Sequence, residues 1–288
     1  MKPLQATGTI DTDGFRLQYI IEGEGNPVLV IGSALYDERV FSRELRSKNK
    51  WIFVDHRGFG AGPKRPFDNS VFDLDILLND IEKVRQHLLL KDFVIVGHSG
   101  HAFMAIEYAK KYPAFVKGVV LTGCGPSNSD DRRKASAEYF EKTASGERRK
   151  SFDDGMKSLM PKIEAQPDKR FIHYCLCAGA QGWYDHTFDA SPLWEGLTTN
   201  MQMFDYVWGC VFRDIDITQG LQNFDKPVFM ALGRYDYLTG PPELWNPIKP
   251  HFKNLTEKIF EQSAHCPQYE QPAEFNAELL RWLLAADR

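Results

Sequence analysis

The chain has 288 residues, of which 43% are hydrophobic and 26% are charged, and its net charge is −4. This composition is ordinary for a globular protein, and the length is sufficient for a large core. No long block of like charges suggests a nucleic-acid partner, and no run of about 18 apolar residues suggests a membrane span. The first residues lack the apolar stretch of a secretory signal, and the five cysteines lack zinc-site spacing, so we expect reduced thiols in the cytoplasm.

The first part of the chain predicts a hairpin, followed by strands that alternate with helices. Alternating apolar residues from Gly8 to Glu22, around Asp13-Gly14, predict the hairpin. The expected strands that follow are 28–31, 51–54, 93–96 and 116–122, and the expected helices are 40–45, 73–90 and 100–112, with a loop at 32–35. This order predicts an α/β protein with a mainly parallel sheet.

The strand pattern then stops, and helical patterns rich in charged and aromatic residues occupy 126–221. It returns at 226–233 and 255–260, and an amphipathic helix at 272–286 closes the chain. A long insertion between two sheet strands predicts a helical cap over the carboxyl edge of the sheet. We therefore expect residues 1–125 and 222–288 to form the core and 126–221 the cap. The alternative is a second, independently folded domain.

Ser99 lies where an apolar strand turns at once into a helical pattern. Gly97, His98, Ser99 and Gly100 match most of the G-x-S-x-G nucleophile elbow, with His101 in place of the second glycine. At such a turn the serine side chain is exposed, with the helix N-terminus behind it. The other interpretation is an ordinary turn in which Ser99 caps the helix.

The loops after the last two strands supply an acid and a base. A serine hydroxyl needs a base to take its proton and a group that orients the base. Asp236 follows the strand 226–233, and His265 follows the strand 255–260. Because parallel strands bring their carboxyl ends to one edge, we expect Ser99, His265 and Asp236 to form a triad. Taken singly, Asp236 could cap a turn and His265 could be a loop residue.

The oxyanion hole is expected to combine the backbone N–H of Gly100 with that of Ser33 or Ala34. No set of His, Asp and Glu has ligand spacing, so we expect no metal and no cofactor. The aromatic residues of the cap suggest an apolar acyl or aryl group on a small-molecule substrate. The expected substrate-binding residues are His98, Trp183 and Trp208.

The motifs together resemble the landmarks of the α/β-hydrolase superfamily. They are Gly97-His98-Ser99, the loop 55–60, Gly233-Arg234-Tyr235-Asp236, the loop 263–267 and the segment 270–275. The similarity covers the chain apart from the cap, and it looks closest to the proline iminopeptidase-like and related esterase branch. This resemblance implies an α/β-hydrolase fold and a cytoplasmic serine hydrolase that cleaves a small ester, amide or lactone without a cofactor.

Two departures from the family pattern lie on the oxyanion side. Gly32-Ser33 replaces the usual His-Gly pair, and His101 replaces a small residue. One alternative is a proline iminopeptidase-type aminopeptidase, which needs a cap carboxylate for the substrate amine; Glu195 is available. The others are a lyase or haloperoxidase-like enzyme on the same triad, and a ligand-binding protein that has lost catalysis.

Overall fold

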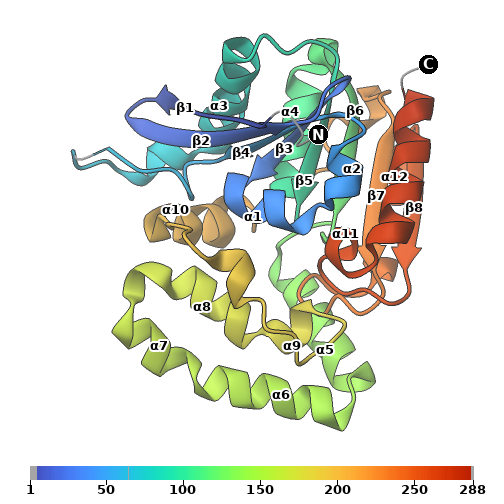
Figure 1. The fold of residues 1–288 in the computed structure, drawn as a ribbon. Coiled ribbons are helices and arrows are strands. Elements are labelled where there is room, and N and C mark those ends of the chain that lie inside the picture. The colour runs from blue at the N-terminus through green and yellow to red at the C-terminus, as the bar shows by residue number, and fades with distance from the viewer. Residues whose placement is uncertain (1–4, 64, 287–288) are drawn as a thin grey trace.

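The computed structural model describes residues 5–63 and 65–286, which form a mixed sheet flanked by helices (Figure 1). Its strands are β1 (Gln5–Thr12), β2 (Phe15–Glu22), β3 (Pro27–Gly32), β4 (Lys50–Asp55), β5 (Phe93–His98), β6 (Val116–Thr122), β7 (Val228–Gly233) and β8 (Leu255–Phe260). Their order across the sheet is β1-β2-β4-β3-β5-β6-β7-β8. The β1–β2 and β2–β4 pairs are antiparallel and the remaining pairs are parallel, which confirms the predicted α/β class.

The predicted hairpin is present at β1 and β2. Thr12 pairs with Phe15, and the two residues between them, Asp13 and Gly14, have φ of +56° and +87°. Positive φ at both central positions defines the turn that matches the twist of two antiparallel strands. The Asp13-Gly14 pair therefore sets the register of the first two strands.

Helices cover both faces of the sheet because successive strand residues point to opposite sides. Leu29 and Ile31 of β3 pack into the cluster that contains α3 and α4, whereas Val28 and Val30 pack into the cluster that contains α1, α2 and α12. These helices are α1 (Ala34–Val40), α2 (Arg43–Arg46), α3 (Leu74–His87), α4 (His101–Lys111) and α12 (Pro272–Ala286), with the short α11 (Pro267–Glu270) before the last.

The region after β3 differs from the prediction of a loop at 32–35 and one helix at 40–45. Ser33 caps a helix that already begins at Ala34, because its hydroxyl accepts the N–H of Tyr36 at 3.3 Å. Ser42 starts the second short helix in the same way, by accepting the N–H of Leu45 at 3.2 Å. Two serine caps thus divide one predicted helix into two and move its start toward β3.

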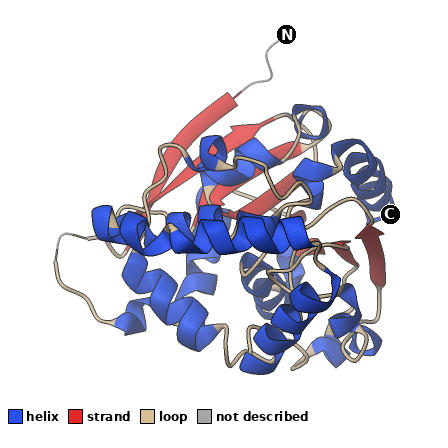
Figure 2. Ribbon diagram, turned by 90° about the horizontal axis from the view of Figure 1, so that it is seen from below, coloured by secondary structure: helices blue, strands red, loops and turns tan. Residues whose placement is uncertain are grey.

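The segment 126–221, called the inserted segment below, lies between β6 and β7 and is helical. Its helices are α5 (Asp130–Thr143), α6 (Gly146–Lys157), α7 (Leu159–Ala165), α8 (Arg170–Cys177), α9 (Gly179–Gly182) and α10 (Met201–Tyr206), followed by the π-helical turn Val207–Val211. Figures 1 and 2 show these helices gathered on one side of the sheet rather than interleaved with its strands. The division into a core of 1–125 and 222–288 and a cap of 126–221 over the carboxyl edge stays a prediction.

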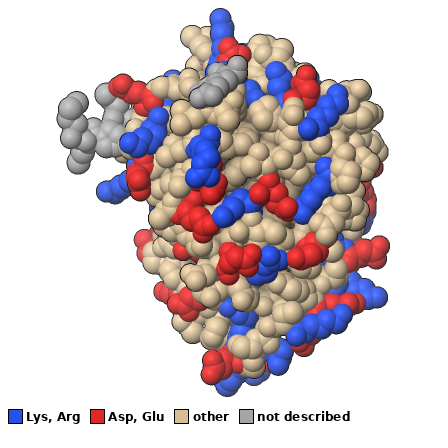
Figure 3. All heavy atoms as spheres, turned by 90° about the vertical axis from the view of Figure 1, so that its right-hand side faces the viewer, with Lys and Arg blue, Asp and Glu red and all other residues tan. Residues whose placement is uncertain are grey.

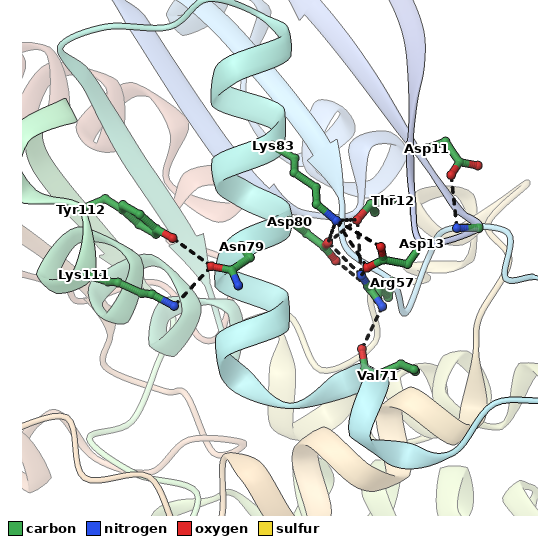
Figure 4. A network of polar contacts seen from close by, with 11 residues as sticks. Asp11, Thr12, Asp13, Arg57, Val71, Asn79, Asp80, Lys83, Lys111 and Tyr112 are labelled. Atoms are coloured by element: carbon green, nitrogen blue, oxygen red, sulfur yellow. Dashed lines mark hydrogen bonds and ion pairs between the residues drawn. The ribbon is translucent and has the colours of Figure 1, made fainter.

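A buried ion pair fixes the loop that follows β4 (Figure 4). The Arg57 side chain is 1% exposed, and its Nε donates to Asp80 Oδ2 at 2.5 Å. Its terminal nitrogens donate to Asp80 Oδ1 at 2.9 Å, to Asp13 Oδ2 at 2.6 Å and to the Val71 carbonyl at 3.0 Å. Arg57 thereby ties the first hairpin and α3 to the carboxyl edge of the sheet.

The surface carries both signs of charge in alternation. On the face drawn in Figure 3, Lys and Arg lie interspersed with Asp and Glu, and neither sign forms a continuous patch. Among the described residues, no helix combines the length and the apolar character that crossing a bilayer requires.

Candidate active site

Ser99 occupies a strained turn between β5 and α4. Its φ is +59°, in the left-handed region, and its N–H donates to the Thr122 carbonyl at 2.9 Å. A helix-capping serine has extended backbone instead, and α4 has no side-chain cap. A Cβ at Gly97 would lie 2.3 Å from the His101 carbonyl oxygen, so only glycine lets α4 cross the strand this closely. The backbone of Ser99 therefore has the strained, left-handed conformation that the predicted nucleophile elbow requires.

The structure brings Asp236 and His265 together from two separate loops. His265 Nδ1 lies 2.8 Å from Asp236 Oδ2, and the Asp236 side chain is 3% exposed. The same carboxylate accepts the N–H groups of Leu238 and Thr239 at 3.0 and 3.1 Å and the Thr239 hydroxyl at 2.6 Å. Burial would raise the pKa of Asp236, but His265 and Thr239 outweigh it and hold the pKa below its ordinary value.

This contact fixes the tautomer of His265. Because a carboxylate only accepts hydrogen bonds, Nδ1 of His265 carries the proton and Nε2 is left with a free lone pair. The backbone N–H of His265 donates to the Gly182 carbonyl of α9 at 3.0 Å, which links the loop to the inserted segment. His265 and Ser99 line the same cavity.

That cavity has a volume of about 690 Å³ and lies between the sheet edge and the inserted segment. Its apolar wall is aromatic, and Phe171 stacks on Phe204 with ring centroids 4.1 Å apart. The predicted substrate-binding residues His98, Trp183 and Trp208 all line it. An apolar acyl or aryl group fits such a wall.

Gly100 and Trp208 join the core and the inserted segment beside Ser99. A Cβ at Gly100 would lie 2.9 Å from three atoms of the Trp208 indole, so the absent side chain makes room for that ring. Trp208 lies in the π-helical turn, and its carbonyl accepts Asn128 Nδ2 at 2.8 Å. Irregular turns of this kind are common at functional sites.

Within the described residues, no protein acceptor contacts the N–H of Gly100, which leaves that predicted oxyanion donor available.

The other predicted oxyanion donors are already engaged. The N–H of Ser33 donates to Asp37 Oδ2 at 2.9 Å, and the N–H of Ala34 donates to Asp55 Oδ1 at 2.7 Å. Burial raises the pKa of Asp37 to about 8 and that of Asp55 to about 6. Ser33 and Asp37 line the cavity, whereas Ala34 is fully buried outside it. In this arrangement Ala34 does not serve as predicted, and Ser33 would have to exchange Asp37 for the substrate.

Three buried histidines near Ser99 are linked by hydrogen bonds that the sequence did not reveal. The N–H of Gly58 donates to His56 Nδ1 at 2.8 Å, so His56 Nε2 carries the proton that it shares with His101 Nε2, 2.8 Å away. His101 Nδ1 in turn donates to the His98 carbonyl at 3.1 Å. His98 Nε2 lies 2.9 Å from the carbonyl oxygen of His265.

Burial keeps these three histidines neutral. It lowers the pKa of His56 well below the ordinary value, that of His101 to about 4 and that of His98 to about 3. Sequence reasoning named His98 as a substrate contact and His101 as a mismatch, but it missed His56. The available clue was that all three follow or end strands at one sheet edge.

Other candidates from the sequence lie elsewhere. Glu195 is exposed and does not line the cavity; its carbonyl accepts Arg39 Nη1 at 2.8 Å. It is therefore not placed to bind a substrate amine there. Within residues 5–63 and 65–286, no group of three His, Cys, Asp or Glu side chains could hold a metal ion. All five cysteines are unpaired.

Comparisons with known proteins agree with the observed fold. A family model described as alpha/beta hydrolase fold matches residues 31–272. AB hydrolase superfamily protein YclE of Bacillus subtilis (strain 168) is 44% identical over 280 residues, which cover 97% of this chain and 99% of the relative. A proline iminopeptidase of Heyndrickxia coagulans is 24% identical, with coverage of 94% and 96%.

Solved structures share the fold at low identity. A proline iminopeptidase of Mycobacterium smegmatis superposes with a TM-score of 0.69 at 14% identity, and the match covers 98% of this chain and 99% of that one. An esterase of Exiguobacterium antarcticum gives 0.67 at 16% identity, covering 94% and 96%. At these identities the likeness concerns the fold alone.

Proposed function

The chain belongs to the α/β-hydrolase fold family, and on that premise we propose that it is a serine hydrolase of small esters, amides or lactones. The observation that carries the proposal is the 2.8 Å contact of His265 Nδ1 with Asp236 Oδ2, on a histidine that shares a cavity with the left-handed Ser99. In this proposal Ser99 is the nucleophile, His265 the base and Asp236 the group that orients the base.

The first half-reaction forms an acyl-enzyme. Ser99 Oγ attacks the substrate carbonyl carbon while His265 Nε2 takes the hydroxyl proton, and Asp236 stabilises the imidazolium that results. The carbonyl oxygen becomes an oxyanion that accepts the N–H of Gly100, with the N–H of Ser33 as second donor once Asp37 releases it. Collapse breaks the bond to the leaving group, which receives the proton from His265.

The second half-reaction repeats these roles with water. His265 Nε2 takes a proton from a water molecule, whose oxygen attacks the acyl carbon. The tetrahedral intermediate collapses, the bond from the acyl carbon to Ser99 Oγ breaks, and His265 returns the proton to Oγ. The product acid leaves, and the enzyme regains its starting protonation. No metal or organic cofactor takes part in the proposed reaction.

The lining of the cavity supports a substrate with an apolar acyl or aryl group, and it does not favour an aminopeptidase. Several relatives bear the name proline iminopeptidase, and that activity would need a carboxylate free to bind the substrate amine. Of the two lining carboxyl groups, Asp205 is paired with Arg170, and burial raises the pKa of Asp37 to about 8, so Asp37 is largely uncharged near pH 7. We also propose a cytoplasmic location, because the five cysteines are unpaired.

Ester turnover by matched variants tests the proposal. With p-nitrophenyl butyrate, Ser99→Ala and His265→Ala are expected to lower kcat by about 10⁴- to 10⁶-fold. Ser127→Ala is the control, because Ser127 lines the same cavity and its hydroxyl contacts only the hydroxyl and the N–H of Ser129 among the described residues. Near-normal turnover by Ser99→Ala would rule out the proposed nucleophile. A folded wild-type protein without turnover of esters, lactones or aminoacyl arylamides would favour the non-hydrolytic or non-catalytic alternatives.

A further inference from the structure

Three arginines line the cavity, and they differ in what neutralises them. Arg170 donates to the Asp205 carboxylate at 2.6 Å, and Arg133 forms an ion pair with Asp130. Both are thus neutralised by carboxylates of the inserted segment. A ligand gains little from an arginine that already has a counter-ion.

Arg132 is different because the two acceptors of its hydrogen bonds carry no charge. One terminal nitrogen donates to the Leu238 carbonyl at 2.6 Å, and the other donates to Asn128 Oδ1 at 2.7 Å. Its Nε–H is buried and meets no acceptor within the described part of the chain. The guanidinium has five N–H groups, so these two bonds leave it short of acceptors.

The surrounding contacts hold the guanidinium in place at the cavity wall. Asn128 is itself fixed, because its Nδ2 donates to the Trp208 carbonyl at 2.8 Å. The stem of Arg132 packs over the loop after β6, where its Cδ lies 3.3 Å from the position of a Cβ on Gly125. Because two neutral acceptors already orient the guanidinium, a charged acceptor can bind it with little further loss of side-chain entropy.

The Asp236 carboxylate acts on Arg132 only through space: burial lowers the pKa of Arg132, and the charge of Asp236 opposes that shift without a hydrogen bond between the two side chains. Asp236 follows β7, as the Leu238 carbonyl does, but its two oxygens are occupied by His265, by Thr239 and by the N–H of Leu238. No ion pair joins Arg132 to any acid among residues 5–63 and 65–286. Arg132 is therefore a cavity-lining cation without a hydrogen-bonded counter-ion, beside the proposed triad.

We propose that Arg132 binds a carboxylate of the substrate, so that the enzyme acts on esters or amides that carry an anionic group beside an apolar one. A planar carboxylate matches the donor geometry of a guanidinium. The aromatic wall then takes the apolar part of the same molecule, and a substrate amine is repelled. This inference rests on the proposed hydrolase activity and specifies its substrate class.

Paired substrates test the inference. The anionic members are mono-p-nitrophenyl succinate, glutarate and adipate and m-carboxyphenyl butyrate, and each is compared with a neutral ester of the same shape. The wild-type enzyme is expected to prefer at least one anionic member in kcat/KM by 10-fold or more. Arg132→Gln is expected to reduce that preference by about 10- to 100-fold, and Arg132→Lys is expected to retain part of it.

The control is Arg149→Gln. Arg149 also lies in the inserted segment and also donates to neutral acceptors, the carbonyls of Glu141 and Ala144, but it does not line the cavity. It is expected to keep the full preference. Because the readout is a ratio of two substrates, a general loss of folded enzyme cancels.

The outcomes separate the inference from the proposed function. If the neutral esters are hydrolysed as fast as every anionic counterpart, the inference is overturned and the hydrolase proposal remains intact. An equal loss on both members of a pair in Arg132→Gln would also overturn it, because the arginine would then be only structural. No turnover of any ester by folded protein would contradict the hydrolase proposal itself.

Discussion

The Nε2 atoms of His56 and His101 lie 2.8 Å apart beside the cavity that Ser99 lines. His56 is neutral because its Nδ1 accepts the N–H of Gly58, and His101 is neutral because its Nε2 accepts the proton of His56 Nε2. One ring comes from the loop after β4 and the other from the first turn of α4. The pair therefore couples the Arg57-anchored loop to the helix that follows the proposed nucleophile. Its neutrality has a measurable consequence in acid.

Acid is expected to destabilise the fold below about pH 6.5. The pKa values of His56, His98 and His101 are lowered in the folded state, so the unfolded chain binds protons first as the pH falls. The stability that the protein has above pH 6.5 is therefore lost as the pH falls toward the pKa of the histidine in the folded state, which is about 4 for His101. Each histidine contributes up to about 1.4 kcal/mol per pH unit to this slope.

Urea unfolding between pH 4.5 and 6.5 measures that slope. His101→Gln is expected to reduce it by up to one proton, whereas His87→Gln, on the exposed face of α3, is expected to leave it unchanged. Equal slopes in the wild type and in His101→Gln would contradict a neutral, buried His101.

Asp37 is expected to act in the opposite direction at higher pH. Its pKa is raised to about 8 by burial, so between about pH 4 and 8 the folded state holds a proton that the unfolded state has lost. Stability therefore falls as the pH rises through this window. Asp37→Asn keeps an oxygen for the N–H of Ser33 and removes the titration, so its Tm advantage over the wild type should grow from pH 5 to pH 8. A constant difference in Tm would refute the raised pKa.

Gly100→Ala is expected to disturb the contact with Trp208. The φ of Gly100 is −60°, which alanine adopts freely, so any cost comes from the 2.9 Å approach to the indole. Such overpacking costs about 1–3 kcal/mol. Thermal unfolding of Gly100→Ala in the wild-type and Trp208→Ala backgrounds measures the coupling. The penalty should nearly vanish without the indole; the same penalty in both backgrounds would place its origin elsewhere.

Asp80→Ala is expected to lower the free energy of unfolding by about 3–5 kcal/mol, because it leaves the buried Arg57 without its main counter-ion. Asp75→Ala is the matched control on the same helix, since Asp75 is exposed in its ion pair with Lys111. It is expected to change stability by less than about 1 kcal/mol. If the two losses in urea unfolding were similar, the Arg57 network would not anchor the loop.

The strands and the proposed triad were predictable because they depend on local pattern and chain order. The apolar, largely β-branched run from Val28 to Ile31 predicts a buried strand, and residues that follow parallel strands meet at one edge. Ser99, Asp236 and His265 each follow such a strand, and the structure places His265 against Asp236 and beside the same cavity as Ser99.

The oxyanion side was less predictable because it depends on contacts between side chains and backbone. Nothing in the sequence indicates that Asp37 turns back four residues to take the N–H of Ser33, or that Asp55 takes that of Ala34. The fit of Trp208 over Gly100 depends on a π-helical turn, which the spacing of apolar residues in the sequence does not predict. The contacts of Asp55 and Trp208 arise from packing between segments that lie far apart in the sequence.

Labelling with a fluorophosphonate tests the central claim most directly. Such a probe phosphonylates a serine only where a base activates its hydroxyl, so intact mass should rise by one phosphonyl group, and tandem mass spectrometry should place it on Ser99. Ser99→Ala, folded to the same Tm, should remain unlabelled. Folded wild-type protein that does not react, or Ser99→Ala that still does, would contradict Ser99 as the nucleophile.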